Sequence, residues 1–212
     1  MTGSHCSARL ITAAALVGVA LAGVPRAAAS QAAPPAQNPY PGRYPFTPAD
    51  VQFVSGMISH HAQAIIMAGW APTHGANPSV RVLCERIINA QTDEITLMQN
   101  WLKDRHQPVP EAKPLPMKMV MDGVEQEMLM PGMLSDEQMK QLDQARGTEF
   151  DRLFLTFMIQ HHRGAITMVD QLFSSPGAGQ DDFVFKFASG VYADQGTEIA
   201  RMQKMILNLP GK

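Results

Sequence analysis

A doubled segment with two adjacent histidines constrains this chain more than any other feature. The first copy, residues 53–67, reads FVSGMISHHAQAIIM, and the second, residues 154–168, reads FLTFMIQHHRGAITM. Four of the seven histidines lie in these copies. Both copies are apolar and helix-forming, so we expect two related helices that each carry a histidine pair.

A second motif follows each histidine segment. Residues 91–98 read QTDEITLM and residues 195–202 read QGTEIARM, so both fit Gln-x-x-Glu-Ile-x-x-Met. Each repeat is therefore predicted to be a helical hairpin, and two hairpins to form an all-α four-helix bundle. The expected helices span about 48–70, 79–105, 148–173 and 181–207.

The repeats set the predicted organisation of the domain, residues 47–209. Repeat one covers 47–105, a linker covers 106–147 and repeat two covers 148–209. The linker begins with a stiff proline-rich part, and residues 117–131 are predicted to hold a short helix. Ser135-Asp136-Glu137-Gln138 is a capping-box pattern that predicts a further helix through about residue 145.

The N-terminal part predicts export. Residues 1–29 contain an apolar, alanine-rich stretch followed by Ala27-Ala28-Ala29, which is typical of a cleaved signal peptide. Residues 30–46 are rich in Ala, Pro and Gln and predict a disordered tether. We expect a periplasmic or secreted protein without a stable membrane span after cleavage, an uncleaved anchor being the alternative. A net charge of -2 argues against nucleic-acid binding.

Helical spacing predicts which side chains share a face. Residues three, four and seven apart lie on one stripe of a helix. In the histidine segments these stripes are Met57, His60, Ala64 and Met67, and Met158, His161, Ala165 and Met168. In the paired helices they are Gln91, Glu94 and Met98, and Gln195, Glu198 and Met202. If these faces turn inward, the bundle encloses imidazoles, thioethers and two carboxylates.

Two accounts of this polar interior are open. In the structural account, the histidines donate hydrogen bonds to Glu94 and Glu198 and so satisfy buried polar groups. In the metal account, the duplicated pairs and their neighbouring methionines bind an ion. The candidate metal residues are His60, His61, His161, His162, Met57, Met67, Met158, Met168, Glu94, Glu198, Met98 and Met202.

Ligand softness decides between metals. Thioether sulfur together with imidazole suits Cu(I) and Ag(I), whereas carboxylate with imidazole would suit Zn, Cu(II) or Fe. A di-iron bundle takes Glu from two helices and Glu-x-x-His from the other two. Because this chain has Gln-x-x-Glu instead, Fe and Zn fit less well than Cu(I).

The linker contains a second group of methionines, in the segments MKMVM at 117–121 and MLMPGM at 128–133. These thioethers stand in a segment that has few reasons to bury them. They either dock on the bundle or capture soft metal ions, and the two functions are compatible.

The motifs resemble those of the domain of unknown function 305 family. The resemblance rests on Met-Ile-x-His-His-x-x-Ala-Ile-x-Met twice, on the motif after each copy, and on PGMLSDEQ and FDRLFL before the second copy. It covers about Pro48 to Leu207. It implies an exported, ferritin-like four-helix bundle, with some members binding Cu(I) or Ag(I) and taking part in copper tolerance. By motif position it carries over the methionines and histidines of both copies.

We therefore predict an exported metal-binding protein that buffers or carries Cu(I) or Ag(I), and that is not an enzyme. Glu94 and Glu198 would orient the imidazoles. The alternatives are a ferritin-like dinuclear Fe or Mn enzyme and a helical interaction module without metal. A copper-delivery partner and a homo-oligomer both remain open.

Overall fold

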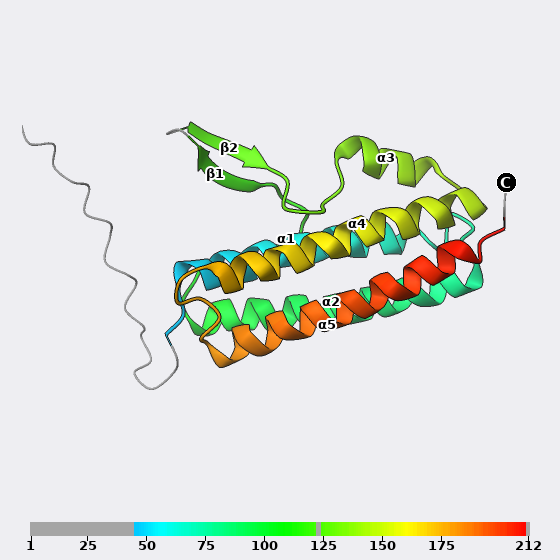
Figure 1. The fold of residues 1–212 in the computed structure, drawn as a ribbon. Helices are drawn as coiled ribbons and strands as arrows, with labels where there is room; N and C mark the ends of the chain where they lie inside the picture. The colour runs from blue at the N-terminus through cyan, green and yellow to red at the C-terminus, as the bar shows by residue number, and fades with distance from the viewer. Residues whose placement is uncertain (1–44, 122–123, 211–212) are drawn as a thin grey trace, which may run out of the picture. The chain divides into compact units, whose positions relative to one another are not determined.

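The structure is a computed structural model that describes residues 45–121 and 124–210, and for residues 117–126 it describes no side chains. The predicted signal segment 1–29 and most of the predicted tether 30–46 lie outside the described residues. The elements in chain order are α1 (Pro48–Gly69), α2 (Pro78–Asp104), β1 (Met117–Met121), β2 (Val124–Met128), α3 (Asp136–Gln144), α4 (Gly147–Ser174) and α5 (Asp182–Leu207) (Figure 1).

The predicted all-α fold is confirmed, and each long helix begins and ends within one residue of its expected bounds. Local capping explains part of this precision, because a side chain caps the start of α1, α2 and α5, whereas α4 begins without a side-chain cap. Thr47 forms a capping box with Asp50 and is followed by Pro48, which suits the first turn of α1. Ser135 forms a second capping box with Gln138 at the start of α3.

The expectation of a short helix at residues 117–131 was wrong. The chain there forms an antiparallel hairpin in which Met117 is paired with Met128 and Met121 with Val124. The dipeptide Asp122-Gly123 between the two segments lies outside the described residues. In sequence it is the strongest short-range signal of a hairpin, because Asp-Gly suits a two-residue turn.

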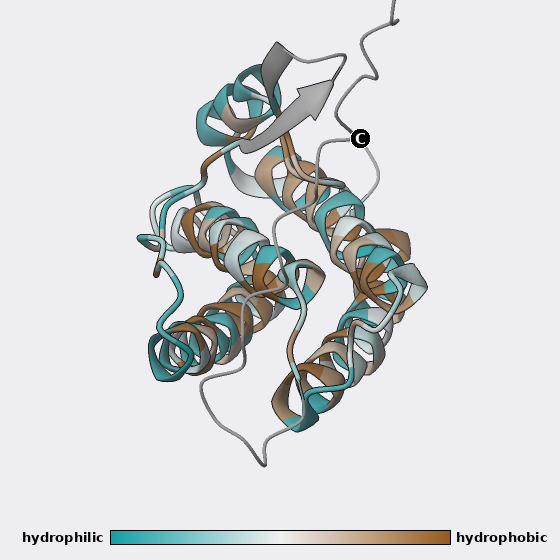
Figure 2. Cartoon of the chain, turned by 90° about the vertical axis from the view of Figure 1, so that its left-hand side faces the viewer, coloured by the Kyte–Doolittle hydropathy of each residue, from teal (hydrophilic) through white to brown (hydrophobic). Residues whose placement is uncertain are grey.

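The four long helices form two hairpins. α1 packs along α2, α4 packs along α5, and the hairpins meet chiefly where α1 contacts α4. In Figure 1, α1 and α4 form one layer of the bundle and α2 and α5 the other. Figure 2 shows that these helices carry both hydrophobic and hydrophilic faces, as amphipathic helices do when they share a core.

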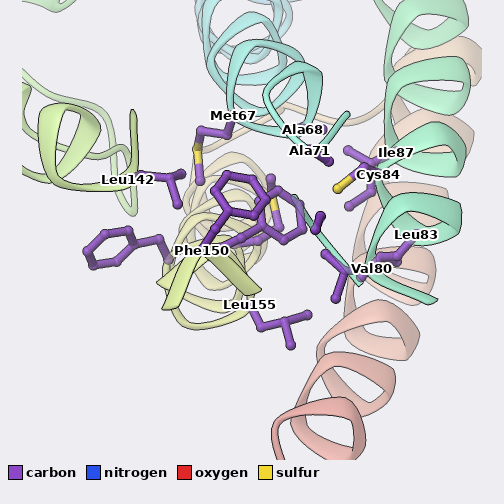
Figure 3. Packing of buried hydrophobic residues seen from close by; sticks show 14 of the residues in the cluster. Met67, Ala68, Ala71, Val80, Leu83, Cys84, Ile87, Leu142, Phe150 and Leu155 are labelled. Carbon is purple, nitrogen blue, oxygen red and sulfur yellow. The ribbon is translucent and has the colours of Figure 1, made fainter. Parts of the chain in front are cut away.

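The core consists of two apolar clusters, each built from all four long helices. The first joins the C-terminal half of α1 to the N-terminal half of α4 and includes Met158. Figure 3 labels Met67 and Phe150 of this cluster. The second joins the opposite halves of the same helices and includes Met57 and Met168. Because each cluster pairs opposite halves of α1 and α4, these helices run antiparallel, and the histidine pairs lie midway along them.

Buried aspartates tie the hairpins together at their ends. Asp50 accepts a hydrogen bond from the backbone N–H of Gly179, 2.7 Å away, and thereby joins the start of α1 to the loop before α5. Asp181 caps α5 and pairs with Arg105 and Trp101 at the end of α2. Burial opposes ionisation of Asp181, but these hydrogen bonds outweigh it and lower its pKa below the ordinary value.

The segment Met130–Leu134, here named the strap, crosses α1 and α4 between the hairpin and α3. Gln63 of α1 holds it by two bonds: its amide donates to the Leu134 carbonyl at 3.0 Å and accepts from the Leu134 N–H at 2.7 Å. On α4 the strap touches the helix at Gly164. A Cβ built there would lie 1.9 Å from the Pro131 carbonyl oxygen.

Within the described ranges, none of the helices combines the length and the apolar character that a membrane crossing requires.

The contact at Gly164 makes a stability prediction. Gly164→Ala forces the strap away from α4, so we expect the free energy of unfolding to fall by about 1–3 kcal/mol, as for an overpacked core. Gly190→Ala is the matched control, since a Cβ at this helical glycine of α5 meets nothing within 4 Å. That variant should gain about 0.5–1 kcal/mol from helix propensity. The urea concentration at the unfolding midpoint measures the stability of both variants. If the two midpoints shifted equally and in the same direction, the close contact at Gly164 would be contradicted.

Candidate metal centre

The two histidine pairs meet at the middle of the bundle, between the apolar clusters. His60, His61, His161 and His162, here named the histidine layer, are all fully buried. The rings of His60 and His161 face each other with centroids 3.8 Å apart and an interplanar angle of 38°. The structure therefore brings together all four histidines that the repeat singled out.

The predicted glutamates reach this layer from the outer helices. Glu198 of α5 accepts a hydrogen bond from His162 Nε2 at 2.7 Å. Glu94 of α2 lies at the same distance, 2.7 Å, from His61 Nε2, as an ion-pair contact without the angle of a hydrogen bond. Both carboxylates are partly exposed, at 24% for Glu94 and 19% for Glu198. The repeat thus builds the same His–Glu pair twice.

His60 has a different partner, the strap. Its Nε2 donates to the Pro131 carbonyl oxygen, 3.0 Å away, because a carbonyl can only accept. Burial, with the neighbouring charge of His61 next in importance, lowers the pKa of His60 to about 3. The ring is therefore neutral near pH 7, and a neutral ring protonated at Nε2 carries its lone pair on Nδ1.

His161 differs from the other three histidines because, among the contacts of the described residues, its ring faces neither a glutamate nor the carbonyl of the strap. Among the described residues, neither of its ring nitrogens forms a well-aligned hydrogen bond, although the side chain is fully buried. Burial is the main cause that lowers its pKa well below the ordinary histidine value, the nearby His60, His162 and His61 add to the effect, and a weak contact with the His60 backbone opposes it. His161 is thus a neutral imidazole with an unpaired lone pair in the centre of the bundle.

The remaining lone pairs of the layer follow a common pattern. In the described part of the chain, the Nδ1 atoms of His60, His61 and His162 are buried and have no hydrogen-bond partner. Their Nε2 atoms all face an oxygen that can only accept, so in the neutral form of each ring Nδ1 would be the basic nitrogen. A carboxylate or carbonyl on one ring nitrogen and a metal on the other is the usual arrangement of ligating histidines.

The methionines lie above and below the layer rather than within it. Met57 and Met158 each precede a histidine by three residues, or ~4.5 Å along the helix axis, whereas Met67 and Met168 lie ~10 Å away. Met57, Met98 and Met168 share one apolar cluster, and Met67, Met158 and Met202 share the other. Along α1 and α4, the methionines nearest to the histidine pairs are therefore Met57 and Met158.

Three residues at the centre of the bundle contribute contacts that the sequence pattern did not predict. Gln63 and Gly164 occupy equivalent positions in the two repeats, and both serve the strap, one by hydrogen bonds and one by close approach. Pro131 contributes the carbonyl that holds His60. The difference between Gln63 and Gly164 at matched positions was one available signal, although the two copies also differ at the positions that flank the histidines directly.

Several buried polar atoms in and beside the layer have no hydrogen-bond partner among the described residues. The Oε1 atoms of Gln91 and Gln195, one turn before the two glutamates, are also buried without a partner among the described residues. In the same part of the chain, no three His, Cys, Asp or Glu side chains converge on a common point. An ion bound there would use few nitrogen ligands or draw the rings together, and sulfur could complete its coordination.

Docking of the linker methionines on the bundle is confirmed for two of them. Met130 and Met133 are buried in the cluster that also contains Met57 and Met168. The prediction for the side chains of Met117, Met119 and Met121 lies outside the described residues.

This chain is similar to one known protein family and to several solved structures. The family model described as domain of unknown function (DUF305) matches residues 50–206. A DUF305 protein from Streptomyces coelicolor, provisionally described as secreted, is 27% identical, with 77% of this chain and 95% of that chain covered and a TM-score of 0.65. CopM in its Cu(II)-bound form is 28% identical, with 75% and 96% covered and a TM-score of 0.58.

CopM has also been solved in Cu(I)-bound, Ag-bound and apo forms that match this chain. A curated relative, uncharacterized protein L153 of Acanthamoeba polyphaga mimivirus, is 38% identical over 56 residues, which are 26% of this chain and 37% of the viral protein. The chain thus matches little more than a third of that relative's length. The family model, in contrast, spans both hairpins, and this chain belongs to the DUF305 family.

Proposed function

We propose that this protein binds Cu(I), and Ag(I) by the same chemistry, at the histidine layer. The observation that carries the proposal is His161, a fully buried imidazole that forms no well-aligned hydrogen bond in the described part of the chain and has only a weak contact with the His60 backbone. Leaving a buried polar group unpaired costs about 1–3 kcal/mol. The structural account explains His61 and His162 through their glutamates, but it leaves His161 unexplained.

The donor set favours a soft ion. The layer offers the neutral imidazoles of His60 and His161, and thioethers of Met57 and Met158 stand about one helical turn from them. Imidazole and thioether together select Cu(I) over hard cations. Glu94 and Glu198 are engaged with different histidines, which suits carboxylates that orient rings and does not suit a bridging carboxylate pair.

Relatives support the same assignment. CopM, which shares the fold at 27–28% identity, binds Cu(I), Cu(II) and Ag in its solved forms. The apolar N-terminal segment and the provisional description of the Streptomyces coelicolor relative as secreted support a location outside the cytoplasm. Buffering or carriage of copper in copper tolerance is the function that combines these features.

His161→Leu tests the proposal because it separates binding from folding. We expect Cu(I) affinity to fall at least about tenfold, whereas the free energy of unfolding changes by less than about 1 kcal/mol, since no hydrogen bond is lost. Affinity is measured by competition with a chromophoric Cu(I) chelator under reducing conditions, and stability by urea unfolding.

His74→Leu is the matched control for that experiment. His74 is also buried, but its Nε2 donates to the Asp143 carbonyl at 2.8 Å and its Nδ1 lies 2.9 Å from the Thr73 hydroxyl. This variant should lose stability and keep its Cu(I) affinity. Unchanged Cu(I) affinity in His161→Leu would refute the proposal, and two iron ions per purified chain would favour the dinuclear enzyme instead.

The glutamates make a second prediction. Glu198→Gln weakens the acceptor that keeps the proton on His162 Nε2, so we expect Cu(I) affinity to fall by about 10–100-fold, as for other partners of ligating histidines. Glu94→Gln should act in the same direction through His61. Glu149, in the first turn of α4, is exposed and lies outside the layer, so Glu149→Gln serves as the charge-matched control that leaves affinity unchanged.

An affinity unchanged in both glutamate variants would mean that these carboxylates only satisfy buried histidines. Far-ultraviolet circular dichroism and the unfolding midpoint of each variant show whether a loss of affinity merely reflects a loss of fold.

A further inference from the structure

A separate group of thioethers lines an open pocket beside the strap. The pocket has a volume of about 390 Å³ and lies between the start of α1, the C-terminal part of α4 and the segment that leads from β2 into the strap. Three of its lining residues are methionines: Met128, Met130 and Met168. Two come from the linker and one from the second histidine helix.

The lining chemistry favours a soft ion over a hard one. None of the described residues that line the pocket carries a charge, and its polar members are Gln52, Gln171 and Ser175. A strongly hydrated cation would have to lose water without a carboxylate to replace it, which is costly. Cu(I) and Ag(I) bind thioether sulfur well and need no such carboxylate.

The three methionines span the distance from solvent to core. Met128 is 43% exposed, whereas Met130 and Met168 are 3% and 5% exposed. The two buried methionines belong to the apolar cluster that also contains Met57, the methionine one turn before His60. The pocket therefore joins one exposed thioether to two buried thioethers that share an apolar cluster with Met57.

The strap connects the pocket to the layer directly. Pro131 lines the pocket, and its carbonyl oxygen accepts the hydrogen bond from His60 Nε2 at 3.0 Å. An ion held by Met130 is thus one residue along the chain from a group that contacts the histidine layer. This adjacency distinguishes the pocket from an apolar depression elsewhere on the surface.

We propose that Met128, Met130 and Met168 form a capture site for Cu(I) or Ag(I), which loads the histidine layer. At capture, thioether sulfur displaces water or a weak carrier ligand, and the ion keeps its oxidation state throughout. Passage to the layer is ligand exchange from thioether to imidazole. Capture depends only on the pocket, whereas the loading step rests on the proposed function of the histidine layer.

The test uses Ag(I), which needs no reductant, and the full mature domain labelled with 13C at the methionine methyl groups. We expect substoichiometric Ag(I) to shift the methyl resonances of Met128, Met130 and Met168. Met128→Leu combined with Met130→Leu should abolish the shift of Met168 and slow loading of the layer at least about tenfold, equivalent to about 1.4 kcal/mol. Leucine preserves side-chain volume, so the fold should persist.

Met205→Leu is the matched control, because Met205 is a partly buried methionine packed against the other apolar cluster. It should leave both the methyl shifts of the pocket and the loading rate unchanged. If the three methyl groups do not respond to Ag(I), or if the double variant loads at the wild-type rate, the capture site is refuted.

Imidazole 15N signals, recorded in the same titration, separate this proposal from the preceding one. Histidine signals that shift while the pocket methyl groups stay silent would refute the capture site and leave the histidine layer intact. Pocket methyl groups that shift while the histidines stay silent would refute loading and the metal function of the layer, and would leave thioether capture standing.

Discussion

The contact between His60 and His161 is the constraint around which the rest of the bundle is arranged. Two buried rings 3.8 Å apart place a polar layer between two apolar clusters. Such a layer is unfavourable unless its polar atoms have partners. Glu94 and Glu198 each supply one partner from an outer helix, and the strap supplies another. The nitrogens that remain are the reason to expect a ligand.

The strap contacts the two sequence repeats differently, so the two histidine pairs have different surroundings. In the first repeat, Gln63 binds the strap and His60 donates to it, whereas in the second repeat Gly164 lets it approach and His161 forms no well-aligned hydrogen bond among the described residues. A duplicated hairpin alone would give two equivalent sites. The strap instead leaves the imidazole of the second repeat as the more available ligand, and it carries Met130 to the same place.

The sequence predicted the helices well because their determinants are local. The capping box at Thr47 and the 3.6-residue periodicity lie within a few positions of each other. It failed at the β1–β2 hairpin, where the turn signal Asp122-Gly123 was not used and a short helix was expected instead. It also could not predict the strap, since the bonds of Gln63 join residues 71 positions apart. The missing partner of His161 depends on ring orientation, which no spacing encodes.

The most direct test of the account is anomalous diffraction from crystals of the protein grown with Ag(I). The account predicts an anomalous peak inside the bundle, within bonding distance of His161 and of at least one Nδ1 atom of His60, His61 or His162. Peaks confined to the surface methionines, with none between α1 and α4, would contradict it. In that case the histidine layer would be a structural feature of the fold, and the metal function would belong to the thioethers alone.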